Sequence, residues 1–504
     1  TTTPTTGASS GGETQTASES AESGKITKTD IVVGQASDIV TLDPAGQQDT
    51  TSGVLMKHAY STLLDVDNEG KVVPDLAESY EMKSDTEYVF KLREDACFWD
   101  GTPVTAQDIK FSLDRAKGMP KTKSNTSKIE EVTVNGDHEV TIKLTEPYAA
   151  FKTIVTQHNL SILSEKAVTE AGDSYGDVDN LLGSGPFKVT EWVPNDHYTL
   201  VRNDNYWGEM PIATSITCRV IPEGSARTIA LEAGEIDVVW SVDPTDCANV
   251  ESNPDVKLLS QPSTGIDYVG MNTQKEKFSD KRVRQAINYA LDKQTFVDTI
   301  IEGRGLVANS YINAAIPGWT DEVEAYPYDP EKAKELLAEA GYPDGFECSI
   351  FVNGDLRTRS AQILQAQLAD VGIKVDISTY EWGALLDTLN AGEHEMFLLG
   401  WSNTSFDPDG STYQLFYSGN HGATGNRAFF SNDKVDELIL SAQRESEESK
   451  RMELYKELQF VLHEESPWCP LYYKENNVGV RADLKGFTLH AGAQHYLGNC
   501  HYEE

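Results

Sequence analysis

Three short strings in this sequence carry residue types that could do chemistry, but none has the local structure that its chemistry requires. Residues 7–11, GASSG, match a nucleophile elbow, yet no predicted strand or helix flanks them to strain the serine. Residues 303–308, GRGLVA, match a dinucleotide-binding loop, but they follow a predicted helix, whereas that loop follows a strand. Residues 65–70, DVDNEG, resemble the start of a calcium loop whose twelfth position would be Leu76 instead of glutamate.

The C-terminal end contains side chains that could bind a metal, namely His490, His495, Cys500 and His501. Their spacing fits no established zinc pattern, so a surface tail or a cysteine held in a disulfide is the better interpretation. HExxH, Walker A and paired zinc cysteines do not occur, and the 80 acidic residues make carboxylate pairs common without implying glycosidase chemistry. We predict that the protein is not an enzyme and has no catalytic residue, metal or cofactor.

Two tryptophans lie where a ligand could bind. Trp382 follows a predicted strand at residues 374–378, and Trp401 lies at the end of another apolar run. In open α/β sheets, the loops at strand ends line the crevice in which ligands usually bind. Packing in the core is the alternative for each tryptophan.

The elements around these tryptophans alternate between strand and helix. Residues 346–352, 357–370 and 374–378 read as strand, helix and strand, and residues 216–221, 225–233 and 236–240 repeat the pattern. Such alternation predicts a mixed or parallel sheet. A chain of 504 residues exceeds what one hydrophobic core usually supports, so two or three lobes are expected.

Composition excludes several partners. The net charge of −38 would repel a polyphosphate backbone or anionic lipid head groups, so we predict no nucleic-acid partner. No apolar run is long enough to span a membrane. Residues 1–27 are so poor in apolar side chains that we expect a disordered tether. The six cysteines permit disulfides in an oxidising compartment, but their spacing selects no pairing.

Several longer strings resemble one family. They are LAESY at 76–80, FKLRED at 90–95, WDGTPVTAQD at 99–108, FSLDRA at 111–116, the stretch 183–208 and GEID at 234–237. Together they resemble the family 5 extracellular solute-binding proteins, which are the oligopeptide, dipeptide, nickel and oligosaccharide receptors of ABC importers. The resemblance covers residues 28–485.

This resemblance implies a two-lobed α/β fold like that of periplasmic binding proteins, with the extra inserted subdomain of the cluster C type. Lobe I would be discontinuous, and the inserted subdomain would belong to it. The expected bounds are 28–58, 182–267 and 475–504 for lobe I, 59–181 for the inserted subdomain and 268–474 for lobe II.

The resemblance also implies a function. A small solute, with a peptide as first choice, would bind between the lobes and be delivered to an ABC transporter permease. The protein would act as a monomer in the periplasm or on the extracellular face of the membrane, held there by an N-terminal lipid anchor. A surface adhesion lipoprotein and an enzyme on the same fold are the alternatives from other classes.

Site residues follow from the resemblance with one departure. Trp382, Trp401, Tyr268, Tyr472 and the loop at Gln47 and Gln48 would line the cleft. Peptide-binding relatives resemble W-x-x-D after the second tryptophan, where the aspartate pairs with the peptide amine.

Here that string reads Trp401-Ser402-Asn403-Thr404, so Asp407 or Asp49 would have to supply the negative charge. Without such a charge the solute would be an oligosaccharide, a blocked or cyclic peptide, or a nickel or other metal chelate. Asn403, Thr404 and Gln48 would then suit sugar hydroxyls.

Overall fold

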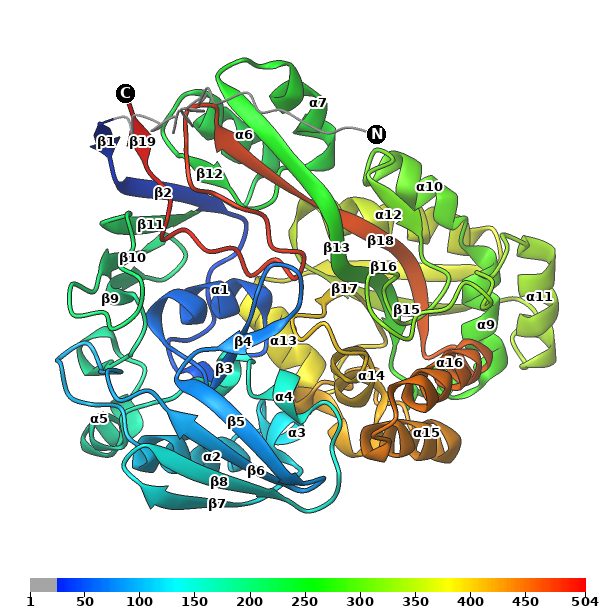
Figure 1. Cartoon of the computed structure of the whole chain (residues 1–504). Coiled ribbons are helices and arrows are strands. Elements are labelled where there is room, and N and C mark those ends of the chain that lie inside the picture. The colour runs from blue at the N-terminus through cyan, green and yellow to red at the C-terminus, as the bar shows by residue number, and fades with distance from the viewer. Residues whose placement is uncertain (1–24) are drawn as a thin grey trace, which may run out of the picture.

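A computed structural model describes residues 25–504 (Figure 1). Most of the predicted tether, residues 1–27, lies outside the described residues. Its last part does not form a tether, because Ile26 and Thr27 belong to strand β1 (Ile26–Lys28), which pairs antiparallel with the C-terminal strand β19 (Tyr502–Glu503). No helix of residues 25–504 has the length and apolar character to span a membrane.

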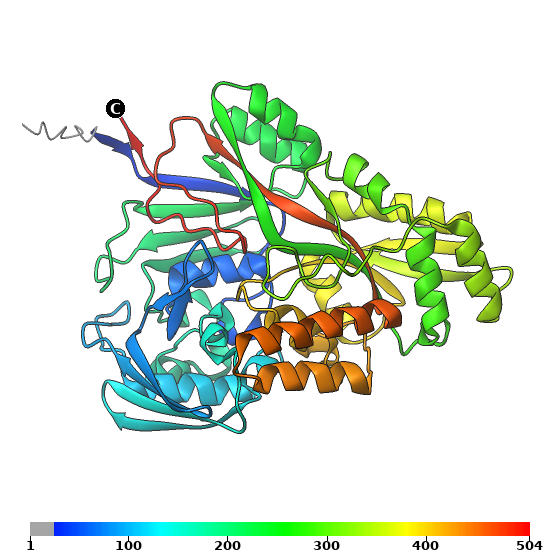
Figure 2. The same ribbon diagram turned by 45° about the vertical axis from the view of Figure 1, so that its right-hand side comes forward.

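One 11-stranded sheet runs through the molecule in the order β16-β15-β17-β13-β18-β12-β2-β11-β10-β9, with β14 added beside β18. Two long antiparallel strands, β13 (Val256–Met271) and β18 (Trp468–Arg481), form its centre and connect its two ends (Figures 1 and 2). Their register shifts between Pro262 and Ile266, where the pair passes from one end to the other. The apolar runs at residues 268–272 and 470–473, each of which predicts a short strand, therefore belong to this crossing.

We call lobe I the part built on β2 (Asp30–Gln35), where parallel pairing with β11 and β12 extends the sheet away from β18. Alternate apolar side chains of these strands, such as Ile31, Val33 and Ile216, pack into one core. The remaining elements of lobe I are α1 (Thr50–Ala59), β9 (Phe187–Val193), β10 (His197–Arg202), β11 (Ser215–Val220), α6 (Gly224–Glu232), β12 (Val238–Val239) and α7 (Pro244–Ser252).

We call the insert the separate four-stranded sheet β5-β6-β8-β7 with its covering helix α2 (Ala106–Lys117) and the short elements around it. Thr105 begins α2 through a capping box with Asp108, as the string WDGTPVTAQD predicts. The remaining elements are β3 (Leu64–Val66), β4 (Val72–Pro74), β5 (Ala77–Ser84), β6 (Glu87–Leu92), α3 (Lys123–Thr126), β7 (Ile129–Gly136), β8 (Glu139–Leu144), α4 (Phe151–Ile154) and α5 (Glu165–Ala171).

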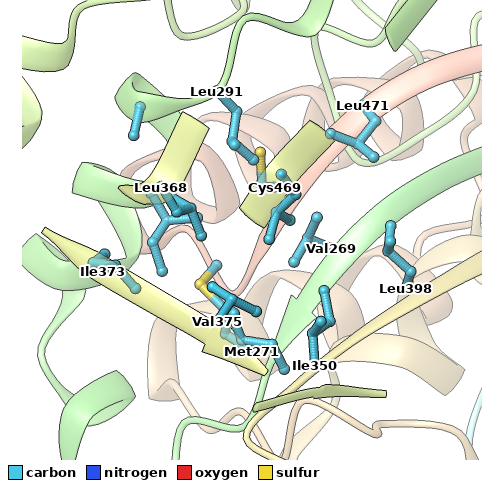
Figure 3. Close-up of a cluster of buried hydrophobic side chains, with 14 of the residues drawn as sticks. Val269, Met271, Leu291, Ile350, Leu368, Ile373, Val375, Leu398, Cys469 and Leu471 are labelled. Carbon is cyan, nitrogen blue, oxygen red and sulfur yellow. The ribbon is translucent and has the colours of Figure 1, made fainter. Parts of the chain in front are cut away.

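We call lobe II the part on the other side of the crossing, where β15 (Phe346–Val352), β16 (Ile373–Thr379) and β17 (Met396–Ser402) extend the sheet. Figure 3 shows the core beneath it, in which Val269 and Cys469 from the crossing strands pack among Ile350, Leu368 and Leu398. Its other elements are α8 (Glu276–Ser279), α9 (Lys281–Ala290), α10 (Lys293–Thr299), β14 (Gly305–Val307), α11 (Pro330–Glu339), α12 (Gly354–Ala369), α13 (Trp382–Asn390), α14 (Asp409–Phe416), α15 (Asp433–Arg444) and α16 (Glu448–Glu465).

All six cysteines are free thiols, and five of them are buried. Cys218 and Cys500 lie in the core of lobe I, and Cys348 and Cys469 lie in that of lobe II. The cysteines therefore act as small apolar side chains, not as cross-links.

Candidate ligand-binding site

A cavity of about 380 Å³ lies between lobe I, the insert and lobe II. Lobe I contributes the segment that begins α1, the insert contributes residues 157–159, and lobe II contributes the ends of β15 and β17. The crossing strand β18 forms another wall through residues 474–477. This volume is at the lower end of the range of roughly 300–1,000 Å³ that is typical of small-molecule pockets.

Contacts between the parts hold the cavity closed. The Thr404 hydroxyl of lobe II donates to Gln157 Oε1 of the insert at 2.7 Å. From lobe I, Gln48 Nε2 donates to the Thr424 carbonyl of lobe II at 3.3 Å. An ion pair joins Arg359 of lobe II to Asp243 of lobe I at 2.6 Å. The structure therefore represents the closed arrangement of the two lobes.

Gln48 and Asp49 line the cavity from the start of α1. Asp49 caps this helix, because its Oδ1 accepts a hydrogen bond from the Ser52 amide at 2.9 Å. Its other oxygen, Oδ2, is buried without a hydrogen-bond partner among the described residues. Burial raises the pKa of this carboxyl above its ordinary value, although the hydrogen bonds from Ser52 and the charge of Lys121 act in the opposite direction.

The two tryptophans line the cavity from lobe II. Trp382 is the first residue of α13, and its Nε1 is buried without a partner within residues 25–504. Trp401 lies near the end of β17, and its Nε1 donates to the Gly410 carbonyl at 3.0 Å. Both rings also pack against buried apolar residues of lobe II, so each has core and cavity surfaces. Their contact with a ligand stays a prediction.

Two arginines in the cavity wall have no carboxylate partner in the described part of the chain. Arg357 has its guanidinium 5.7 Å from the centre of the Trp382 ring and donates only to Asn353 Oδ1 at 3.3 Å. Arg427 is 6% exposed and donates through Nε to Asn390 Oδ1 at 3.0 Å. Burial lowers the pKa of Arg427, and the opposing influence of Tyr268 and Asp49 offsets this effect only in part.

Of the other charged residues at the cavity, Glu475 makes no ion pair within the described residues, whereas two cations are paired. Lys474 pairs with Asp267 at 3.0 Å, and Arg304 pairs with Glu251 at 2.7 Å. His158 and His495 also line the cavity, and burial lowers the pKa of each to about 4, so both are neutral at pH 7. Arg357 and Arg427 are therefore the cations of this wall that remain available to an anionic group.

Asp407 does not line the cavity, which corrects the expectation that it could balance a ligand amine. Its carboxylate pairs with Arg451 inside lobe II, at 2.9 Å to Nη1 and 2.5 Å to Nη2. The neighbouring Asn403 is also turned inward, where its Nδ2 donates to the Asp407 carbonyl and to Ser411 Oγ at 2.7 Å each. Of this string, only Thr404 and the two residues Trp401 and Ser402 reach the cavity.

Tyr268 and Tyr472 lie on the crossing strands, but neither lines the cavity. Both are 2% exposed. Tyr268 stacks on Trp468 with ring centres 3.4 Å apart, and Tyr472 belongs to the core shown in Figure 3. Both side chains are therefore turned into the cores, and β18 lines the cavity through residues 474–477 instead.

Neither arginine was predicted from the sequence to line the ligand site. Arg357 follows the end of β15 by a few residues, so the rule that selected Trp382 could have found it. Arg427 lies in an irregular segment between α14 and α15 and carries no such signal.

Known proteins resemble this chain over nearly its whole length. The model of the bacterial extracellular solute-binding proteins, family 5, matches residues 71–423. The glutathione-binding protein GsiB of Escherichia coli (strain K12) is 31% identical over 479 residues, which cover 91% of this chain and 92% of that protein. The region matched by the family model includes Trp382, Trp401 and Arg357, and Arg427 lies just beyond it.

Solved structures are similar as well. DppA of Helicobacter pylori, a periplasmic binding protein in complex with the peptide STSA, has a TM-score of 0.90 at 28% identity, covering 95% of this chain and 99% of its own. AppA of Bacillus subtilis, an oligopeptide-binding protein in complex with a nonapeptide, has a TM-score of 0.87 at 26% identity, covering 95% and 100%.

Proposed function

The chain belongs to family 5 of the bacterial extracellular solute-binding proteins, and from this premise we propose that its solute is a short peptide with a free carboxylate. Family membership makes the protein the substrate-binding component of an ABC importer, a receptor and not an enzyme. It binds its ligand outside the membrane, in the periplasm or extracellular space, and hands it to a permease.

The observation that carries the proposal is the pair Arg357 and Arg427. Neither guanidinium makes an ion pair within the described residues, and Arg427 is buried, so a negative charge on the ligand would stabilise both cations. A ligand carboxylate supplies that charge and accepts several hydrogen bonds from each planar guanidinium. A neutral oligosaccharide supplies no charge, so the arginines favour a peptide over a sugar.

A peptide also brings an ammonium group, for which we propose Asp49 as partner. Its free Oδ2 is buried at the cavity wall, whereas Asp407 is already neutralised by Arg451. An ammonium beside Asp49 would offset the effect of burial on its pKa. Glutathione, which the similar GsiB binds, carries both types of group and is of a size suited to a small cavity.

Calorimetry with four probes tests this function: tri-alanine, glutathione, tri-alanine amide and maltotriose. We expect tri-alanine or glutathione to bind, and tri-alanine amide to bind about 10- to 100-fold more weakly, because a charge-assisted hydrogen bond contributes about 1.5–3 kcal/mol. Arg357→Met should lower the affinity for the free acid and leave that for the amide nearly unchanged.

The matched control is Arg282→Met, since Arg282 pairs with Asp280 on the surface of α9 and does not line the cavity. Binding of maltotriose without binding of either free peptide would overturn the proposal.

The division into lobes follows the predicted bounds as a proposal. Its support is that one core draws only on residues 63–162, which fall inside the proposed insert, 59–181. Two further cores draw on residues 266–473, close to the proposed lobe II, 268–474. Limited proteolysis should cut near the junction at 181–182, whereas the junction at 58–59 lies in the buried end of α1 and should resist cleavage.

Two further expectations remain proposals, namely a lipid anchor at the N-terminus and a monomeric state. The support for both is the resemblance to the family, and the polar composition of residues 1–24 also supports the anchor. Labelling of the native protein with palmitate and light scattering of the purified chain test them.

A further inference from the structure

A second hollow, of about 620 Å³, lies next to the cavity at the boundary of the lobes. It is lined by residues 36–40 and 192–195 of lobe I, by Lys121 of the insert, and by residues 381–387 of lobe II. Three residues line both hollows, namely Ser37, Leu386 and Trp382. Ser37 is small and Leu386 is 6% exposed, so the indole of Trp382 is the bulk of the wall between the two hollows.

Trp382 is held in this position from one side only. Its helix α13 is anchored in the core of lobe II by Leu385 and Leu389, and the guanidinium of Arg357 lies 5.7 Å from the ring centre. Its Nε1 has no hydrogen-bond partner among the described residues, but it lies near Asp49 of lobe I, because Trp382 helps to lower the pKa of that carboxyl against the effect of burial. The ring thus closes the cavity as a partition carried by lobe II.

The outer hollow offers polar partners for peptide groups. Glu381 and Asp387 project from α13 with exposed side chains, and Lys121 faces them from the insert. Burial lowers the pKa of Lys121, and the negative charges of Asp49 and Asp387 act in the opposite direction. Lys121 is therefore close enough to interact with both acids. Charges of both signs suit the backbone amides or terminal groups of a chain that extends beyond the inner cavity.

We propose that Trp382 sets the upper length of the ligand by separating the inner cavity from the outer hollow. This rests on the proposed function, because it takes the ligand to be a peptide. A ligand that fits the inner cavity keeps the partition closed and contacts the ring. A longer ligand meets the indole, and it can bind only if the ring is removed or displaced.

The test measures the affinity of di- to hexa-alanine for the wild type and three variants, all of the full chain. Trp382→Ala should bind the longer peptides at least about tenfold more tightly than the wild type does, and should lose affinity for the shortest ones. Trp382→Phe, which keeps most of the bulk, should retain the wild-type length profile. Circular dichroism and thermal unfolding verify that each variant is folded.

Trp401→Ala is the matched control, because Trp401 lines the inner cavity but not the outer hollow. It should weaken binding at every length without favouring longer peptides. The inference is overturned if Trp382→Ala weakens all lengths equally, as Trp401→Ala does, while the wild type still binds peptides. If the wild type binds no alanine peptide, the proposed function fails, and the inference about length fails with it.

Discussion

Replacing Asp407 with asparagine distinguishes a structural carboxylate from one that binds ligand. In the closed structure this carboxylate pairs with Arg451 through two hydrogen bonds, and the side chains are only 11% and 4% exposed. Nε of Arg451 has no partner among the described residues, so besides Asp407 the guanidinium has a contact of 3.4 Å to the Tyr455 hydroxyl and a contact of 3.8 Å to the exposed carboxylate of Glu448. Asparagine removes the charge and leaves the guanidinium buried without its counter-ion.

Removing one partner of a buried pair costs about 3–5 kcal/mol. The lower end applies here, because Asp409 lies nearby. Burial, followed by the charge of Asp407, raises the pKa of Asp409 to about 6, so loss of Asp407 lets Asp409 ionise more readily and compensate Arg451 in part. A loss of about 3 kcal/mol corresponds to a decrease in Tm of roughly 6–12 °C for a unit the size of lobe II.

Urea unfolding of the ligand-free protein measures the change in stability, and calorimetry with tri-alanine measures binding by the folded variant. We expect the free energy of unfolding to fall and the affinity to stay close to that of the wild type. Asp407→Leu combined with Arg451→Met removes both charges and should recover most of the stability. Unchanged stability together with lost peptide binding would refute this reasoning and place Asp407 at the ligand.

Three other predictions concern charge and thiols. Asp49→Asn keeps the helix cap, so stability should change by less than about 1 kcal/mol, while affinity should fall for tri-alanine but not for N-acetyl-tri-alanine; equal losses would contradict the role of Asp49. Lowering the pH from about 7 to about 4 should decrease the free energy of unfolding measured in urea titrations. In that range the unfolded chain binds more protons than the folded chain, because burial lowers the pKa of six histidines to about 3 or 4. They are His58, His158, His394, His463, His490 and His495. Asp75 and Asp409, with pKa values raised to about 7 and about 6, act in the opposite direction, and a net rise in stability at about pH 5 would show that they dominate. Without reductant, all six thiols should react with DTNB after denaturation, and dithiothreitol should leave Tm unchanged; fewer reactive thiols would reveal a disulfide.

Local patterns in the sequence predicted many elements correctly. Thr105 before an apolar period predicts the start of α2, and Asn135-Gly136 between alternating apolar residues predicts the hairpin of β7 and β8; the structure confirms both. The apolar residues between 54 and 64 predict a helix over that range, but α1 begins at Thr50 and ends at Ala59. The cap from Asp49 explains why α1 begins at Thr50, and the spacing of apolar residues carries no information about a polar cap.

The site was only partly accessible from the sequence. Trp382 follows β16 and Trp401 lies near the end of β17, and the rule for strand ends placed both at the cavity. Gln48, Asp49 and Thr404 also reach it, whereas Tyr268, Tyr472, Asn403 and Asp407 are turned into the protein. Residue type alone does not distinguish these two groups, because a polar or aromatic side chain can complete a core as readily as it can face a ligand.

The sequence by itself determined the family, the α/β class and the receptor role, because several long strings, such as WDGTPVTAQD at 99–108, resemble those of the family. Only the tertiary structure decided which charges are free. Asp407 and Arg451 are far apart in the chain yet neutralise each other, while Arg357 and Arg427 come from separate segments of lobe II and remain unpaired. Such pairing depends on contacts between segments that are distant in the chain, and these contacts form only when the whole chain has folded.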